Sequence, residues 1–260
     1  MILGEIEHNR FKYKQLYFLD KNIEITDKNW DILRVYQSEV ELKNTNDFYT
    51  LFTKLDLDID KIKQQFSKTI KQEINRNIKK DKILIEIIEN PTLNQINELM
   101  NHYIEFKKFK NLTTDVEYMK KSFIAISKNI VIFKAKYEND YLIYHSYIVD
   151  NKRAKLKTSS SSRDNKEKEL INLISRTNKR MHYEAIKYFK LKGKLIYDWG
   201  GVDKDISTGV SKFKKSFGGY LVNEYEGLIF KNKFIKLKYL IKEIGYIELF
   251  KKIIEKVKNV

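Results

Sequence analysis

The 260-residue sequence contains no cysteine and only one proline. Without cysteine, it can form no disulfide, no thiolate zinc site and no cysteine nucleophile. No apolar run approaches the roughly 18–20 residues that span a membrane. The N-terminus also lacks the basic-then-apolar pattern of a signal peptide, so we expect a cytoplasmic protein. The four histidines form no HxH or HExxH pattern, and we therefore expect no metal site.

The residues that are present suffice for a folded core. Hydrophobic residues make up 42% of the chain and aromatic residues 13%. This composition excludes a disordered basic tail, because such tails lack the apolar surface needed to fold. The length suits one large domain or two small ones.

The net charge of +16 is unevenly distributed. Lysine, asparagine and isoleucine are abundant, as AT-rich codon usage would produce, so only uneven placement is evidence of a binding site. Residues 1–60 are net acidic, whereas residues 152–180 are strongly basic and hold four of the arginines: Arg153, Arg163, Arg176 and Arg180. Because arginine binds phosphate with two parallel N–H groups, this segment is either an anion site or a solvated loop with a chance cluster.

Hydrophobic periodicity and turn residues predict the element order. We expect short extended stretches over 16–19 and 32–40 and a strand over 48–57. A helix over 61–80 follows, because apolar residues recur every four positions. A strand over 82–89 leads to a helix that Asn90 caps and Pro91 begins, ending near 109. The rest of the prediction comprises a helix over 115–127, strands over 130–137, 141–149 and 153–160, a helix over 178–192, a strand over 194–199, a helix over 210–217, a strand over 220–230 and a basic helical region over 234–258.

Asx-containing turns separate the three strands after residue 130, which indicates an antiparallel meander. With helices before and after it, this meander predicts an α/β fold in which a mixed sheet carries helices on its faces.

Glycine is scarce, with nine residues in all, yet seven of them lie within 193–227. They frame two motifs: Tyr197-Asp198-Trp199-Gly200-Gly201, and the segment from Gly209 through Phe213-Lys214 to Phe217-Gly218-Gly219. These motifs resemble the GNAT acyltransferase superfamily, and within it the Fem-like branch of peptidoglycan aminoacyltransferases.

The resemblance implies a GNAT-like α/β fold with a mixed, mainly antiparallel sheet and helices on both faces. It places the acyltransferase domain at 48–230. Residues 1–47 would form a strand-rich N-terminal extension, and residues 231–260 a basic helical segment packed on the domain.

The same resemblance implies transfer of an acyl or aminoacyl group to an amine. The donor would be acyl-coenzyme A, acyl carrier protein or aminoacyl-tRNA. The acceptor would be an amino sugar or a small or lipid-linked precursor of the cell envelope. Lys214 matches the family lysine and would contact the charged oxygen of the reacting carbonyl. Tyr197, Trp199 and Lys71 would lie on the substrate side.

The glycine-rich pyrophosphate loop of ordinary coenzyme A-dependent relatives is missing, and Ile174–Asn178 stands in its place. A helix beginning at Thr177–Asn178 would present free N–H groups to the donor phosphates. Arg176 and Arg180 would flank these groups.

Three of these residues keep a second interpretation. Asp198 is a candidate general base for the amine, or it caps the turn that follows its strand. His182 is either a second candidate base or a structural residue of its helix. Lys214 is either a catalytic contact or a surface lysine on a short amphipathic helix.

A rival class uses the same basic residues without catalysis. Tyrosines interleaved with lysines can stack on RNA bases, and the C-terminal segment combines apolar residues with lysines, as helices on an anionic membrane do. We therefore keep open a basic module that binds RNA, and a peripheral membrane contact.

Overall fold

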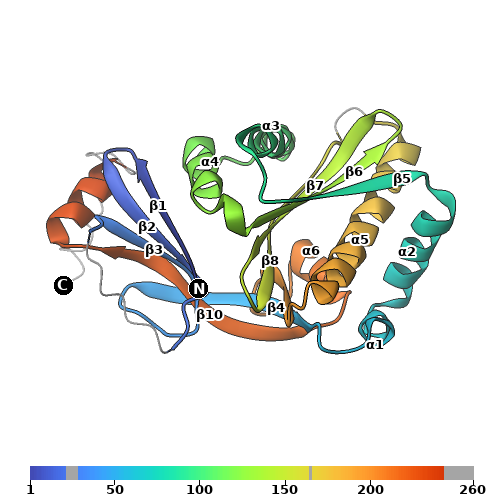
Figure 1. The fold of residues 1–260 in the computed structure, drawn as a ribbon, viewed down its shortest axis with the longest axis horizontal. Coiled ribbons are helices and arrows are strands. Elements are labelled where there is room, and N and C mark those ends of the chain that lie inside the picture. The colour runs from blue at the N-terminus through green and yellow to red at the C-terminus, as the bar shows by residue number, and fades with distance from the viewer. Residues whose placement is uncertain (22–28, 164–165, 243–260) are drawn as a thin grey trace. The chain divides into compact units, whose positions relative to one another are not determined.

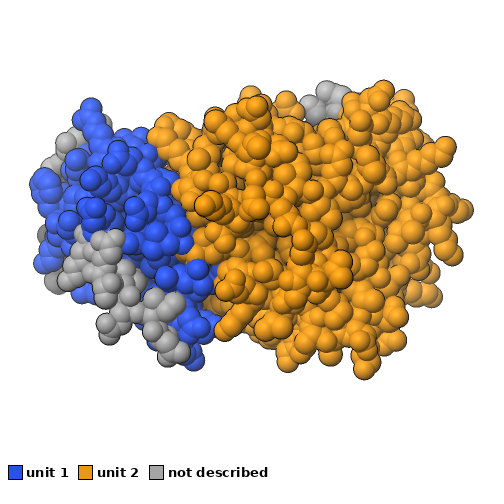
Figure 2. All heavy atoms as spheres, viewed as in Figure 1, with its two compact units in different colours: residues 1, 3–46, 225–260 blue, residues 2, 47–224 orange. Residues whose placement is uncertain are grey.

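A computed structural model describes residues 1–21, 29–163 and 166–242 (Figure 1). The chain divides into two compact units (Figure 2). The first unit comprises residues 1, 3–46 and the chain from Tyr225 onward, and the second comprises residues 2 and 47–224. Residues 225–230, which we assigned to the central domain, therefore group with the N-terminal strands.

The second unit is built on one mixed sheet. Its strand order is β10 (Tyr220–Phe230), β4 (Thr45–Lys54), β9 (Ile196–Gly201), β8 (Arg153–Ser161), β7 (Asp140–Val149), β6 (Ile130–Tyr137) and β5 (Ile83–Glu89). The first five residues of β10 belong to this unit. The pairs β4–β9, β8–β7, β7–β6 and β6–β5 are antiparallel, and β8–β9 is parallel. The predicted α/β class, with a mainly antiparallel sheet, is confirmed.

Six α-helices of this unit are described: α1 (Ile59–Gln64), α2 (Lys68–Lys80), α3 (Leu93–Phe109), α4 (Val116–Ala125), α5 (Lys168–Leu191) and α6 (Gly209–Lys215). A short 3-10 helix at Ser127–Asn129 precedes β6. In β7, Tyr144 donates a hydrogen bond to Glu98 of α3, while the next residue, His145, hydrogen-bonds Asn178 of α5. Because successive side chains of a strand point to opposite faces, α3 and α5 cover opposite faces of the sheet (Figure 1).

The first unit contains β1 (Ile2–His8), β2 (Phe11–Tyr17), β3 (Ile32–Ser38) and the rest of β10, in that order. β2 and β3 are parallel, and β3 pairs antiparallel with β10. Residues 233–242 are helical, and Tyr239 contacts the rings of Phe11 and Phe230. The remainder of the predicted basic helical region, from residue 243, lies outside the described residues.

Three predicted helix boundaries are wrong. The helix predicted over 61–80 is broken before Ser67, whose side chain caps α2 and whose N–H donates to the Ser216 carbonyl. Asn90 is not a helix cap, because it takes a positive φ of 49°. α5 begins at Lys168, ten residues before the predicted start.

The observed cap of α3 is Thr92, two residues beyond the predicted one. Its hydroxyl accepts the Gln95 N–H while the Gln95 side chain accepts the Thr92 N–H, which completes a capping box. We expect Thr92→Ala to lower the free energy of unfolding by about 1 kcal/mol, as loss of an N-cap typically does. Urea unfolding of both proteins measures the difference, and Thr92→Ser, which keeps the hydroxyl, should remain close to wild type. An unchanged midpoint for Thr92→Ala would show that this cap does not stabilise the fold.

Candidate active site

β8 and β9 define the candidate site, because their pairing is short. Arg153, Ala154 and Lys155 pair with Ile196, Tyr197 and Asp198, and among the described residues the ladder ends there although β8 continues to Ser161. Gly200 then adopts a φ of 68°, and a Cβ at that position would lie 2.7 Å from the Leu156 carbonyl oxygen. A side chain would be both strained and obstructed, so this strand end requires glycine.

Asp198 holds the strand end together. It is fully buried, and its Oδ1 accepts the Gly200 N–H at 2.8 Å and the Thr50 hydroxyl at 2.6 Å. Its Oδ2 lies 3.7 Å from Arg153 Nη1. These contacts match the turn-capping interpretation of Asp198.

Arg153 carries a buried positive charge next to Asp198. It is 6% exposed, contacts Glu224 through Nη2 at 2.8 Å and through Nη1 at 3.1 Å, and lies over the Phe52 ring. Burial disfavours its charge, but Glu224 and Asp198 more than compensate and raise the Arg153 pKa. β8, β9 and β10 are therefore joined by one buried charged cluster.

Lys214 is carried by α6, whose N-terminus Thr208 caps. Its Nζ donates to the Gly201 carbonyl at 2.7 Å, at the end of β9. Burial lowers the Lys214 pKa to about 8; Asp198 opposes this shift, and Lys155 adds to it. An ammonium carries three N–H groups, so two remain for a negatively charged ligand atom after the bond to Gly201.

His182 lies in an aromatic cluster next to this end of the sheet. It is 1% exposed, and its ring contacts Trp199, Phe213 and Phe217. Burial keeps the His182 pKa well below its usual value, and interactions with His145 and with the Lys214 ammonium lower it further. The imidazole is therefore neutral, which fits a structural role better than that of a general base.

Tyr197 and Trp199, predicted on the substrate side, are both fully buried. The Trp199 indole N–H donates to Thr53 at 3.0 Å. Their side chains form the interior support of the site and have no exposed surface for a substrate. Lys71 donates to the Gln64 carbonyl at 3.5 Å, at the break between α1 and α2, and no described contact joins it to Lys214.

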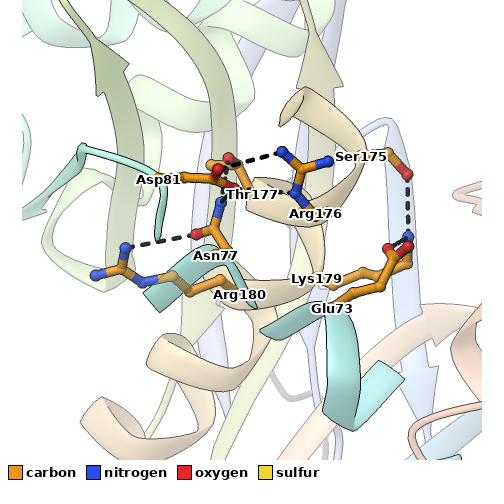
Figure 3. A network of polar contacts seen from close by, with 8 residues as sticks. All are labelled: Glu73, Asn77, Asp81, Ser175, Arg176, Thr177, Lys179 and Arg180. Atoms are coloured by element: carbon orange, nitrogen blue, oxygen red, sulfur yellow. Dashed lines mark hydrogen bonds and ion pairs between the residues drawn. The ribbon is translucent and has the colours of Figure 1, made fainter. Parts of the chain in front are cut away.

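The residues predicted to bind phosphate have other partners (Figure 3). Thr177 is fully buried in the middle of α5 and accepts a hydrogen bond from Asn77 of α2. Arg176 donates to the Asp81 carboxylate through Nε at 3.0 Å and through Nη2 at 3.2 Å. Arg180 donates to Asn77 at 3.4 Å.

The predicted helix N-terminus at Thr177–Asn178 is therefore wrong, because α5 already runs through it. Its N–H groups are part of the helix, and Asn178 instead accepts a hydrogen bond from His145. These side chains join α5 to α2 and β7.

Two residues next to the site, Lys155 and Thr50, were not predicted from the sequence. Lys155 is 5% exposed and lies 4.9 Å from the Phe48 ring centre, and Thr50 binds Asp198. Lys155 and Arg153 belong to the basic segment that we singled out. Both lie in the strand predicted over 153–160, and this position could have separated them from the solvated lysines of the segment.

No group of three or more His, Asp or Glu side chains in the described part of the chain could hold a metal ion. None of its helices is long and apolar enough to cross a membrane.

The fold is shared with solved structures. The crystal structure of FemX superposes with a TM-score of 0.58 at 14% sequence identity, covering 94% of this chain and 86% of FemX. L-PGS from Bacillus licheniformis superposes with a TM-score of 0.50 at 13% identity, covering 84% of this chain and 74% of that one. No family model matches the sequence, and no curated protein matches it. The resemblance to the Fem-like branch is thus confirmed for the fold.

Proposed function

We propose that the protein is an acyltransferase that moves an acyl or aminoacyl group from an activated donor to an amine. The observation that carries the proposal is the partly buried Lys214 ammonium, tied to the Gly201 carbonyl beyond the point where β8 and β9 stop pairing. The fold shared with FemX supports it.

In this reaction the amine nitrogen bonds to the carbonyl carbon, and the bond from that carbon to the donor's sulfur or oxygen breaks. The amine loses a proton and the leaving group gains one. Negative charge builds on the carbonyl oxygen, where preorganised donors stabilise the transition state most. The two remaining N–H groups of Lys214 would fill this role. Asp198 and Gly200 would fix the strand end on which Lys214 rests.

The donor and acceptor follow from the resemblance. Acyl-coenzyme A, acyl carrier protein and aminoacyl-tRNA are the donor classes, and a small or lipid-linked envelope precursor or an amino sugar is the acceptor class. A cytoplasmic location stays a prediction. The helix-terminus phosphate site is dropped from the proposal, because Thr177 and Asn178 lie within α5.

The proposal is tested by incubating the protein with each donor class and recording its melting temperature and product formation by mass spectrometry. A ligand at 100 times its Kd stabilises the native state by about 2.7 kcal/mol, so a true donor should raise the melting temperature clearly. Bulk polyanion such as heparin serves as the control. Stabilisation by heparin and by no donor, with no product from any donor, would favour the non-catalytic basic module instead.

A further inference from the structure

A chain of hydrogen bonds runs through the interior of the second unit, from α5 through β7 and β9 and back to α5. His145 Nε2 lies 2.7 Å from Asn178 Oδ1, and His145 Nδ1 lies 3.2 Å from the Tyr147 hydroxyl. The Tyr147 and Tyr197 hydroxyls are 3.1 Å apart, and Tyr197 lies 2.8 Å from His182 Nδ1. The four ring-bearing residues are at most 1% exposed, so these groups are shielded from bulk water.

The chemistry of each partner gives the chain a direction. The Asn178 carbonyl oxygen can only accept, so His145 carries its hydrogen on Nε2. The neutral His145 ring then accepts on Nδ1, which makes Tyr147 the donor there. With its single hydrogen used, Tyr147 accepts from Tyr197, and Tyr197 in turn accepts from His182.

We infer that Asn178, His145, Tyr147 and Tyr197 hold His182 in the tautomer with hydrogen on Nδ1 and leave a lone pair on Nε2, in a ring that contacts Phe213 of α6. Because the two nitrogens lie on different sides of the ring, Nε2 is directed away from Tyr197. None of the described residues hydrogen-bonds Nε2.

The tautomer matters because the His182 ring contacts Phe213 of α6, the residue directly before Lys214. With hydrogen on Nδ1, Nε2 keeps a lone pair that can attract a nearby cation, whereas the opposite tautomer would carry an N–H there. Burial lowers the His182 pKa, and interactions with His145 and Lys214 lower it further, so the ring stays neutral. His145 and Tyr197 are its other titratable neighbours. The four chain members are thus positioning residues, and their contribution to acyl transfer rests on the proposed function.

The test is nitrogen NMR of the full chain labelled with ¹⁵N-histidine, in which protonated and unprotonated ring nitrogens have well-separated shifts. The His182 signals are assigned by their loss in His182→Gln. We expect a protonated Nδ1 and an unprotonated Nε2 in the wild type. A protonated Nε2 in the wild type would overturn the inference without any variant.

Tyr147→Phe tests the direction of the hydrogen bonds along the chain without changing a direct partner of His182, since Tyr197 lies between the two residues. Without the Tyr147 oxygen, Tyr197 is free to donate to His182 Nδ1, and we expect the hydrogen of His182 to move to Nε2. Tyr144→Phe is the matched control, because it removes a hydroxyl from the same strand that binds Glu98 on the other face. Persistence of the Nδ1 hydrogen in Tyr147→Phe, or its loss in Tyr144→Phe, would overturn the chain.

The same variants separate this inference from the proposed function. The NMR result requires no substrate and stands even if no donor supports transfer. If transfer is found, Tyr147→Phe should lower kcat with little change in KM, while Tyr144→Phe should leave both close to wild type. Equal kcat in the two variants would remove the role of the chain in positioning Lys214.

Discussion

Replacing Lys214 with alanine should reduce acyl transfer by about 10²–10³ in kcat, the usual effect of removing one donor to a developing oxyanion. The variant loses the ammonium that rests on the Gly201 carbonyl, and no other described lysine donates to that oxygen. Lys212→Ala is the matched control, because Lys212 belongs to the same helix and is exposed. Product formation under saturating donor measures both variants.

The pH dependence gives the same prediction an independent readout. The Lys214 pKa is lowered to about 8, chiefly by burial, so the ammonium is lost as pH rises through that value. A role for the charged form therefore predicts that kcat falls above about pH 8 and is level below it. A rate that rises through pH 8 would instead mean that the neutral amine acts. Retention of transfer by Lys214→Ala would remove Lys214 from the chemistry altogether.

Much of the fold followed from local pattern. The meander over residues 130–160 and the helix face of Ile70 and Ile74 were predictable because strand alternation and helical periodicity are local properties. The break at Ser67 was not, since it depends on a bond to Ser216 far along the chain. The early start of α5 was within reach, because Leu173, Ile174 and Thr177 continue the buried face of Met181 toward the N-terminus.

The sequence predicted where the candidate site lies along the chain, but not the hydrogen-bond and ion-pair partners of its residues. The glycine-containing motifs placed Asp198 near the end of a strand and Lys214 on the short helix that follows. Gly200 occurs at this strand end because its positive φ is one that other residues rarely adopt. The partners of the arginines depend on packing between distant segments. Arg176 was expected to face a phosphate, yet its Nε and Nη2 both donate hydrogen bonds to Asp81.

Arg153→Met should lower the free energy of unfolding by about 3–5 kcal/mol, because removing one member of a buried ionic cluster leaves its partners uncompensated. Asp198 is fully buried and Glu224 is 2% exposed, and both lie next to the Arg153 guanidinium. Methionine keeps much of the side-chain volume over the Phe52 ring, so the loss reports mainly on charge. Urea unfolding measures it.

The control for that loss is an exposed ion pair. Lys121 contacts Glu117 at 2.8 Å on the surface of α4, where the two side chains are 41% and 68% exposed. Since exposed pairs contribute about 0–1 kcal/mol, Lys121→Met should change stability little. Should Arg153→Met be no more destabilising than Lys121→Met, the cluster would not be what holds β8, β9 and β10 together. A large loss would show that the ion pair of Arg153 with Asp198 stabilises the end of β9, whose Gly201 carbonyl accepts a hydrogen bond from Lys214.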